Sequence, residues 1–307
     1  MAGLTRRTQA WRDSGRFVEA GGHQIFLRER EGLGPPILFL HGYPSSSFDW
    51  WRLLEALPGR RAVSFDFLGF GLSDKPREHL YPLLAQADLA EEIARQTNLE
   101  RCLLVALDMG ASVATELLAR DLEGRLGLRL DAVLLLNGSM ILERASLTVS
   151  QRILRGPLGP LLARLSRAFL FRAQFARIFS PAHPLEREEA DDQWSLLAHR
   201  QGNRIVDRLT HYLHERMIFA PRWHGALRDW PGRLELAWGM RDPVAVEAVL
   251  DAVLALRPHA KVTRFPALGH YPQVEDPAAV AAVLAALAAR INGNSMTGAN
   301  APAPARR

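Results

Sequence analysis

Short apolar runs that end in polar or glycine-containing loops recur along the first half of the chain. They cover residues 36–40, 61–67, 101–107 and 130–136. Runs of this length and composition are typical of strands that are buried on both faces of a parallel sheet. Segments with helical periodicity, such as residues 81–97, separate the runs. The alternation of strand and helix predicts an α/β fold with a doubly wound, mostly parallel sheet.

This alternation stops in the middle of the chain and resumes near its end. Residues 140–228 contain no convincing buried strand, and Leu, Phe and Arg recur there at helical spacing. Strand-like runs return at residues 234–239 and 261–265, and we expect a final helix at residues 277–291. The sequence therefore predicts four parts, which are a first core segment at residues 1–139, a helical insertion at 140–228, a second core segment at 229–291 and a disordered tail at 292–307.

The composition is that of a globular protein and limits the chemistry available to it. The chain has 307 residues, of which 48% are hydrophobic and 23% are charged. Cys102 is the only cysteine, which excludes an intrachain disulfide and a cysteine-based zinc site. The longest near-continuous apolar stretch, residues 278–289, is too short to span a bilayer, and residues 1–11 lead into no signal-peptide core. We expect a cytoplasmic protein.

The formal net charge of +5 raises the question of a nucleic-acid partner. The basic residues are nearly all arginine, with Lys75 and Lys261 the only lysines, and they are interleaved with Asp and Glu along the chain. No zinc-finger, RNP or basic-zipper pattern accompanies them. We therefore interpret the charge as an arginine-rich composition and expect no nucleic-acid partner.

Polar residues that suit catalysis follow several of the predicted strands. In a parallel sheet the loops after the carboxyl ends of the strands meet at one edge, where α/β proteins form their sites. Asp108 follows the run at 101–107, with the small residues Ala106 and Gly110 on either side of it. This is the pattern of a nucleophile elbow, a turn so tight that small residues must flank the nucleophile. A carboxylate there can attack an sp3 carbon and form an ester. The alternative is that Asp108 only caps the next helix.

Two later loops supply candidates for a base and its supporting acid. His270 follows the last predicted strand and Asp242 follows the one before it, which gives the chain order nucleophile, acid, base. Asp242 would orient and charge-stabilise the imidazole. Glu247 and Asp251, on the next helix, are weaker alternatives for the acid.

The loop at residues 41–44 is the candidate for an oxyanion hole. The backbone N–H groups of Tyr43 and Met109 would form it together. We expect His41 at the substrate pocket, as a turn residue rather than as a base.

Three motifs carry a resemblance to a known family. They are the segments at residues 41–50, 66–76 and 270–277, with further matches at 238–244 and 212–223. On these segments, and over most of residues 17–290, the chain resembles the α/β-hydrolases of the epoxide hydrolase and haloalkane dehalogenase group, and within it the mesoderm-specific transcript protein subfamily. It departs from the group at the elbow, with Ala106 and Leu107 where relatives usually show Gly and His.

The resemblance implies an α/β-hydrolase fold with the insertion as a cap, and a hydrolysis in two steps. Asp108 would attack the substrate to form an alkyl-enzyme ester, and His270, assisted by Asp242, would activate water to cleave it. The amides of Tyr43 and Met109 would hold the oxyanion. The resemblance implies no metal and no cofactor, and a small apolar organic substrate.

Two leaving groups fit this scheme. Halide release in dehalogenase relatives usually uses a Trp directly after the nucleophile and a partner such as Asn in the first loop, where this chain has Met109 and Tyr43. Trp194 and Trp223 of the insertion are the possible substitutes at the pocket. Epoxide relatives use cap tyrosines as acids, and Tyr212 is the tyrosine of the insertion. This favours an epoxide, with Tyr212 as proton donor, and leaves the dehalogenase as the alternative.

Two further interpretations stay open. The first is a hydrolase fold kept as a ligand-binding or membrane-associated protein, since residues 153–179 combine arginines with Leu and Phe in the manner of an interfacial helix. We favour instead a cap helix with a solvated arginine side. The second is a serine esterase that uses Ser45, Ser46, Ser47 or Ser112. The sequence does not determine an oligomeric state.

Overall fold

One mixed sheet forms the centre of the computed structural model, which describes residues 3–157 and 159–297. The strand order is β1-β2-β4-β3-β5-β6-β7-β8, and pairing is parallel from β4 through β8 and antiparallel at β1 and β2. The strands are β1 (Arg16–Ala20), β2 (His23–Arg30), β3 (Leu33–Leu40), β4 (Arg60–Phe65), β5 (Arg101–Leu107), β6 (Arg129–Leu136), β7 (Leu234–Gly239) and β8 (Lys261–Phe265). This confirms the predicted doubly wound, mostly parallel sheet.

Alternate side chains of the central strands enter two separate cores, one on each face of the sheet. In β5, Cys102, Leu104 and Ala106 join one core, and Leu103 and Val105 join the other. This explains the continuous apolar runs, because a strand covered on both faces has no polar side.

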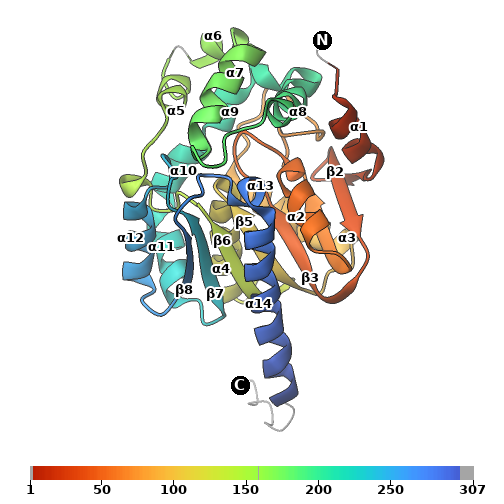
Figure 1. Cartoon of the computed structure of the whole chain (residues 1–307), viewed down its shortest axis with the longest axis vertical. Coiled ribbons are helices and arrows are strands. Elements are labelled where there is room, and N and C mark those ends of the chain that lie inside the picture. The colour runs from red at the N-terminus through yellow and green to blue at the C-terminus, as the bar shows by residue number, and fades with distance from the viewer. Residues whose placement is uncertain (1–2, 158, 298–307) are drawn as a thin grey trace.

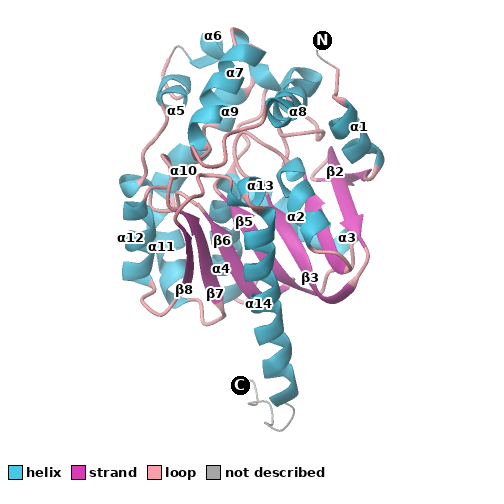
Figure 2. Cartoon of the chain, viewed as in Figure 1, coloured by secondary structure: helices cyan, strands magenta, loops and turns pink. Residues whose placement is uncertain are grey.

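Helices cover both faces of the sheet, and Figure 2 shows the strands between them. One face carries α3 (Leu83–Gln96), α4 (Met109–Leu122), α11 (Ala220–Asp229) and α12 (Glu247–Leu256). The other carries α2 (Trp51–Ala56), α13 (Pro272–Glu275) and α14 (Pro277–Thr297). The remaining elements at the start of the chain are α1 (Arg6–Asp13) and the 3-10 helix η1 (Ser47–Trp50).

A group of helices lies beyond the edge of the sheet where the parallel strands have their carboxyl ends, at the end of the molecule opposite the far end of α14 (Figure 1). We call them the cap helices; they are α5 (Val149–Leu154), α6 (Gly159–Arg164), α7 (Ala168–Phe175), α8 (Arg187–Ala198) and α9 (Val206–Leu209). The short helix η2 (Leu142–Arg144) precedes this group and the helix α10 (Tyr212–Ile218) follows it, while η3 (Ala176–Ile178) and η4 (His199–Arg204) lie between its members. The described residues of the expected insertion at 140–228 contain no strand.

Two boundaries differ from the sequence expectations. The helix α11, which begins inside the expected insertion, packs against α4 of the core. The last helix continues to Thr297, past the expected end of the core at residue 291. The rest of the expected disordered tail, residues 298–307, lies outside the described residues. Within the described ranges, no helix has both the length and the hydropathy needed to cross a membrane.

Candidate active site

Asp108 lies on a sharp turn between β5 and α4, where its backbone φ is +45°. A positive φ is uncommon for a residue with a side chain, and the tight packing around this turn maintains it. At Gly110 a Cβ atom would come within 2.5 Å of the Leu40 carbonyl oxygen, and at Gly42 it would come within 3.0 Å of the Asp108 Cβ. The turn therefore needs glycine at residue 110, one of the two small flanks that the elbow pattern predicts, and it has little room for a side chain at residue 42.

The two carboxylate oxygens of Asp108 have different surroundings. The Tyr43 N–H donates a hydrogen bond of 3.0 Å to Oδ2. Oδ1 is buried and accepts no hydrogen bond from the described residues. The side chain makes no capping bond to α4, which argues against the helix-cap alternative. Of the two oxygens, Oδ2 is thus held by a backbone donor and Oδ1 is left without one.

Arg216 of α10 approaches Asp108 from the side of α4, and its side chain is only 1% exposed. Its Nη2 donates to the Asp108 carbonyl oxygen at 3.0 Å and lies 3.6 Å from Oδ1. Its Nε donates to the Ser112 hydroxyl at 2.8 Å. The guanidinium also lies 4.6 Å from the ring centroid of Tyr212. Arg216 therefore holds the backbone of the elbow by a hydrogen bond and places a positive charge next to the Asp108 carboxylate.

The sequence analysis missed Arg216. A buried arginine is rare, so no composition rule selects one of the many arginines of this chain. One signal was available, since Arg216 comes four residues after Tyr212, and residues at that spacing share a helix face.

His270 and Asp242 meet beside the elbow. The Nδ1 atom of His270 lies 2.7 Å from Asp242 Oδ2. Asp242 is fixed in turn, because Oδ2 also accepts from the Asn137 side chain at 2.7 Å and Oδ1 accepts from the Val244 N–H at 2.6 Å. Asn137 also binds both backbone polar groups of Gly239, at the end of β7. The acid paired with His270 is therefore Asp242, and Asn137 is a supporting residue that the sequence analysis did not identify.

The charges around His270 decide its protonation. Burial by itself lowers the pKa of His270, but the charge and hydrogen bond of Asp242, followed by the charges of Asp108 and Glu275, raise that pKa to about 9. His270 therefore carries a proton at neutral pH.

Tyr212 is buried next to this group. Its ring lies 5.5 Å from that of Tyr43, and its hydroxyl accepts a hydrogen bond of 3.1 Å from Gln151 of α5. Burial, and next the negative charge of Asp108, raise the pKa of Tyr212 well above its usual range. The phenol therefore carries its proton at neutral pH, and Tyr212 is not among the residues that line the cavity beside Asp108.

The remaining expected site residues are buried elsewhere or lie outside the cavity. His41 does not line the cavity; its Nδ1 lies 2.8 Å from the Gly42 carbonyl oxygen and its Nε2 accepts from the Phe67 N–H. Burial lowers the pKa of His41 to about 3, so it is a neutral turn residue. Met109 is buried at the start of α4.

The two tryptophans expected at the pocket do not reach it. Trp223 is buried between α11 and α4, and its indole N–H donates to Glu116 at 2.9 Å. Trp194 packs against Phe171, with ring centroids 5.7 Å apart, and is likewise absent from the cavity wall. Both helix-borne tryptophans serve packing, so neither N–H group faces Asp108.

A cavity of about 220 Å³ connects the elbow with the cap helices. Asp108, Tyr43 and His270 form its polar wall at the core side, and the polar residues at the cap side are Thr148, Ser150, Gln151, Ser166 and Gln174. The rest of the wall is mostly apolar and comes from the cap helices and the segments beside them, with Ile153, Leu154, Leu162, Leu165, Leu170, Phe171, Phe175, Ile178, Leu197 and Val206. An apolar cavity of this volume with few convergent polar groups favours a small apolar substrate.

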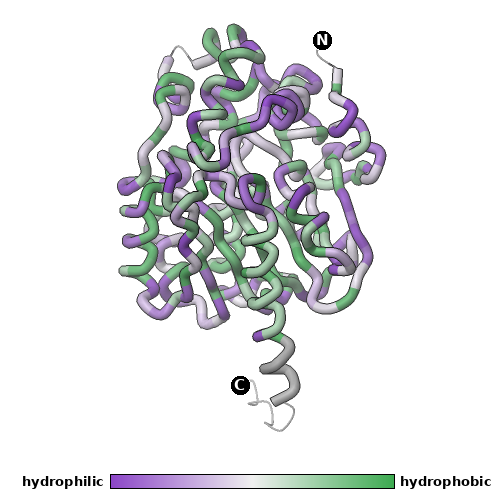
Figure 3. Tube along the Cα trace, viewed as in Figure 1, coloured by the Kyte–Doolittle hydropathy of each residue, from purple (hydrophilic) through white to green (hydrophobic). Residues whose placement is uncertain are grey.

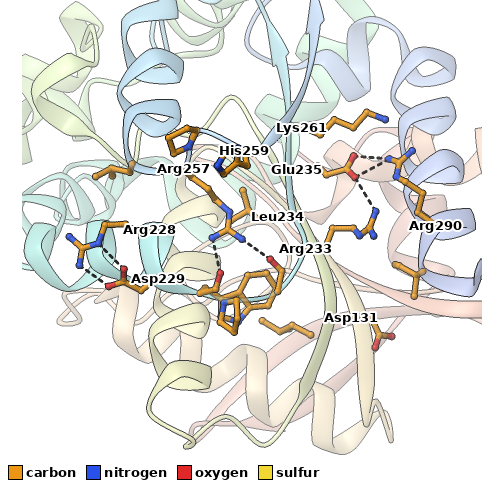
Figure 4. A pocket seen from close by; sticks show the side chains of 18 of the residues that line it. Asp131, Arg228, Asp229, Arg233, Leu234, Glu235, Arg257, His259, Lys261 and Arg290 are labelled. Carbon is orange, nitrogen blue, oxygen red and sulfur yellow. Dashed lines mark hydrogen bonds and ion pairs between the residues drawn. The ribbon is translucent and has the colours of Figure 1, made fainter. Parts of the chain in front are cut away.

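A larger hollow of about 1160 Å³ lies at the opposite ends of the same strands (Figure 4). Its charged side chains are mainly paired with one another. Arg290 binds Glu235 at 2.7 Å, and Arg228 binds Asp229 at 2.7 Å. Asp108 and His270 are not part of it. Despite its size we place the candidate active site in the smaller cavity, where the polar groups converge.

Comparisons with known proteins identify the family to which this fold belongs. A profile of the alpha/beta hydrolase family matches residues 37–283. LipZ of Mycobacterium tuberculosis is 54% identical over 271 residues, which cover 88% of this chain and 94% of LipZ. The mesoderm-specific transcript homolog protein of Homo sapiens is 35% identical over 286 residues, which cover 89% of this chain and 85% of that protein. Among solved structures, a haloalkane dehalogenase from Bradyrhizobium elkani has a TM-score of 0.78 at 23% identity and covers 92% of this chain and 99% of its own. The last likeness concerns the fold alone.

Proposed function

The chain belongs to the alpha/beta hydrolase family, and from that premise we propose that it hydrolyses a small apolar epoxide through an ester of Asp108. The observation that carries the proposal is the unequal surroundings of the two Asp108 oxygens. Oδ2 is held by the Tyr43 N–H, whereas Oδ1 has no hydrogen-bond donor in the described residues and belongs to a carboxylate in the wall of an apolar cavity. A serine nucleophile would need no such carboxylate.

In the first step, Oδ1 attacks an epoxide carbon, so a carbon–oxygen bond to Asp108 forms and the ring carbon–oxygen bond breaks. The oxygen that leaves the carbon takes up the proton of Tyr212, whose own oxygen is held by Gln151. The product of this step is a hydroxyalkyl ester. Strain in the ring and general acid catalysis both favour the opening.

In the second step, His270 first passes its proton to the Tyr212 phenolate that the ring opening leaves, and the neutral imidazole then takes a proton from water as the water oxygen attacks the carboxyl carbon of the ester. The negative charge moves to Oδ2, where the Tyr43 N–H stabilises it. We assign the Met109 N–H, at the start of α4, as the second donor. When the ester breaks, the diol leaves with the former Oδ1, which takes up the second proton of the attacking water, so that Asp108 is again a carboxylate and His270 is again protonated. The net reaction consumes one water molecule.

Carbon–halogen hydrolysis is the second candidate, because the same nucleophile and base serve it. The surroundings of Trp194 and Trp223 argue against it, since a departing halide needs N–H donors near the nucleophile. The protonated phenol of Tyr212 suits an alkoxide better than a halide.

The serine esterase alternative has less support. Ser112 binds Arg216, and the hydroxyl groups of Ser45 and Ser47 donate to the buried carboxylates of Asp49 and Asp66. In the described residues, no serine hydroxyl is hydrogen-bonded to His270. A non-catalytic ligand-binding role would not require the pairing of His270 with Asp242.

A single turnover in ¹⁸O-labelled water tests the proposal. With enzyme in excess over a panel of aliphatic and aryl epoxides, the label should enter the Asp108 side chain, and the first diol should carry unlabelled oxygen from the protein. Direct attack of water on the epoxide would instead place the label in the diol at once and leave Asp108 unlabelled. Asp108→Asn should abolish turnover. A fluorophosphonate that labels one of the serines and blocks turnover would favour the esterase.

A further inference from the structure

Large apolar side chains gather on the outer surface of the cap helices. Of the eleven large apolar residues that are exposed in the described chain, six fall between residues 149 and 170. We call these six the cap roof; they are Val149, Ile153, Leu161, Leu165, Phe169 and Leu170. Their exposed fractions run from 42% to 65%. Figure 3 shows green turns at this end of the molecule, where Figure 1 places α6 and α7. An apolar patch on a protein surface commonly marks a site of contact with a membrane or with another protein.

The chain segment that carries the cap roof has charges of one sign. Residues 144–185 contain seven arginines and no Asp or Glu. Arg152, Arg155, Arg164 and Arg167 are exposed. Among the described residues, no carboxylate is in ion-pair contact with any of these four. A second copy of this chain would bring like charges together, whereas an anionic surface would neutralise them.

The cavity of the candidate active site extends to the same surface. Ile153, Leu165 and Leu170 belong to the cap roof and also line the cavity. The cap roof therefore lies at the cap-side end of the apolar path to Asp108.

We propose that the cap roof docks on an anionic lipid surface and that the active-site cavity receives its apolar substrate from there. The apolar side chains would enter the acyl boundary while the arginines contact the phosphate groups, as in interfacial helices. Docking does not depend on the chemistry at Asp108. The delivery of substrate from lipid rests on the proposed function.

Co-sedimentation with vesicles tests the docking without any turnover. The full-length chain is used as Asp108→Asn, with vesicles of phosphatidylcholine alone or with phosphatidylglycerol added. The account predicts binding to the anionic vesicles, little binding to the neutral ones, and release by salt. A failure of the proposed chemistry leaves this result unchanged.

Variants locate the contact on the molecule. Arg164→Gln with Arg167→Gln should weaken binding about 25-fold, at about fivefold for each arginine near the surface. Phe169→Ser, which does not touch the cavity, should weaken it as well. The matched control is Arg129→Gln with Arg228→Gln, which removes the same charge at the hollow of Figure 4 and should bind like the parent.

Three results would overturn the proposal. They are no binding to anionic vesicles, an equal loss of binding in the control pair, and a dimer in lipid-free solution that Phe169→Ser dissociates. Circular dichroism of each variant confirms that it is folded before binding is compared.

Discussion

The contact between Arg216 and Asp108 can be tested by stability alone, before any substrate is known. The perturbations are Arg216→Met, Asp108→Asn and the double variant. Methionine keeps much of the length of the arginine stem and removes its charge and its donors. Asparagine keeps the shape of the aspartate and removes its charge.

The structure sets the size of the expected coupling. The two side chains are 1% and 2% exposed, and Nη2 lies 3.6 Å from Oδ1. At an effective dielectric constant of about 20, two unit charges at this distance attract by about 5 kcal/mol, which is an upper bound. Removal of one partner from a buried pair typically costs about 3–5 kcal/mol, because the other charge stays buried. We expect Arg216→Met to lower the free energy of unfolding of the parent by about 3–5 kcal/mol. In the Asp108→Asn background the same substitution should cost about 2–3 kcal/mol less.

Urea unfolding of the four proteins, followed by tryptophan fluorescence, gives the coupling free energy. The exposed pair Arg228–Asp229 serves as the control and should show no resolvable coupling. If Arg216 and Asp108 couple by less than about 0.5 kcal/mol, the guanidinium does not support the charge of the elbow and the assignment fails.

Three further predictions concern the base, the acid and the turn. The pKa of His270 is raised from 6.5 to about 9, so protonated His270 contributes about 3 kcal/mol to the free energy of unfolding. This contribution is complete below about pH 6.5 and is lost as the pH rises through about 9. Unfolding measured from pH 6 to 10 should show the loss in the parent and not in His270→Gln, and equal pH slopes for the two proteins would contradict the prediction. Tyr212→Phe should lower kcat on epoxides by about 100-fold or more and leave halide displacement nearly unchanged, and an equal loss on both substrates would argue against its role as acid. Gly110→Ala should destabilise the chain by more than about 1 kcal/mol in thermal unfolding, because the new Cβ would lie 2.5 Å from the Leu40 carbonyl oxygen, and a neutral result would show that the turn is looser than described.

The sequence was most informative where burial is complete. Strands such as β5 and β6 are covered on both faces, so their apolar character is continuous and visible. The edge strand β1 was missed because residues 16–20 alternate in burial and are short. The far end of α14 was missed because Asn and Gly at residues 292–294 are poor helix formers, although an established helix can continue through them.

The site was predicted where it lies on loops of the sheet and missed where it depends on packing between helices. His270 and Asp242 follow successive strands, so topology alone brings them together. Trp223 lies on the helix α11, and a single sequence does not reveal which element a given face of a helix will pack against. Here α11 packs against α4. Arg216 belongs to the same class of residue, since only the packing of α10 against the elbow brings it to Asp108.

The central claim, an ester on Asp108, is tested most directly by trapping it. His270→Gln should form the ester and fail to hydrolyse it, because the base is gone while the nucleophile remains. After incubation with the epoxide panel, mass spectrometry of the digested protein should show the peptide that contains Asp108 heavier by the mass of one epoxide, and Asp108→Asn should show no such gain. An adduct on a serine, or none on Asp108 with any epoxide or haloalkane of the panel, would contradict the account.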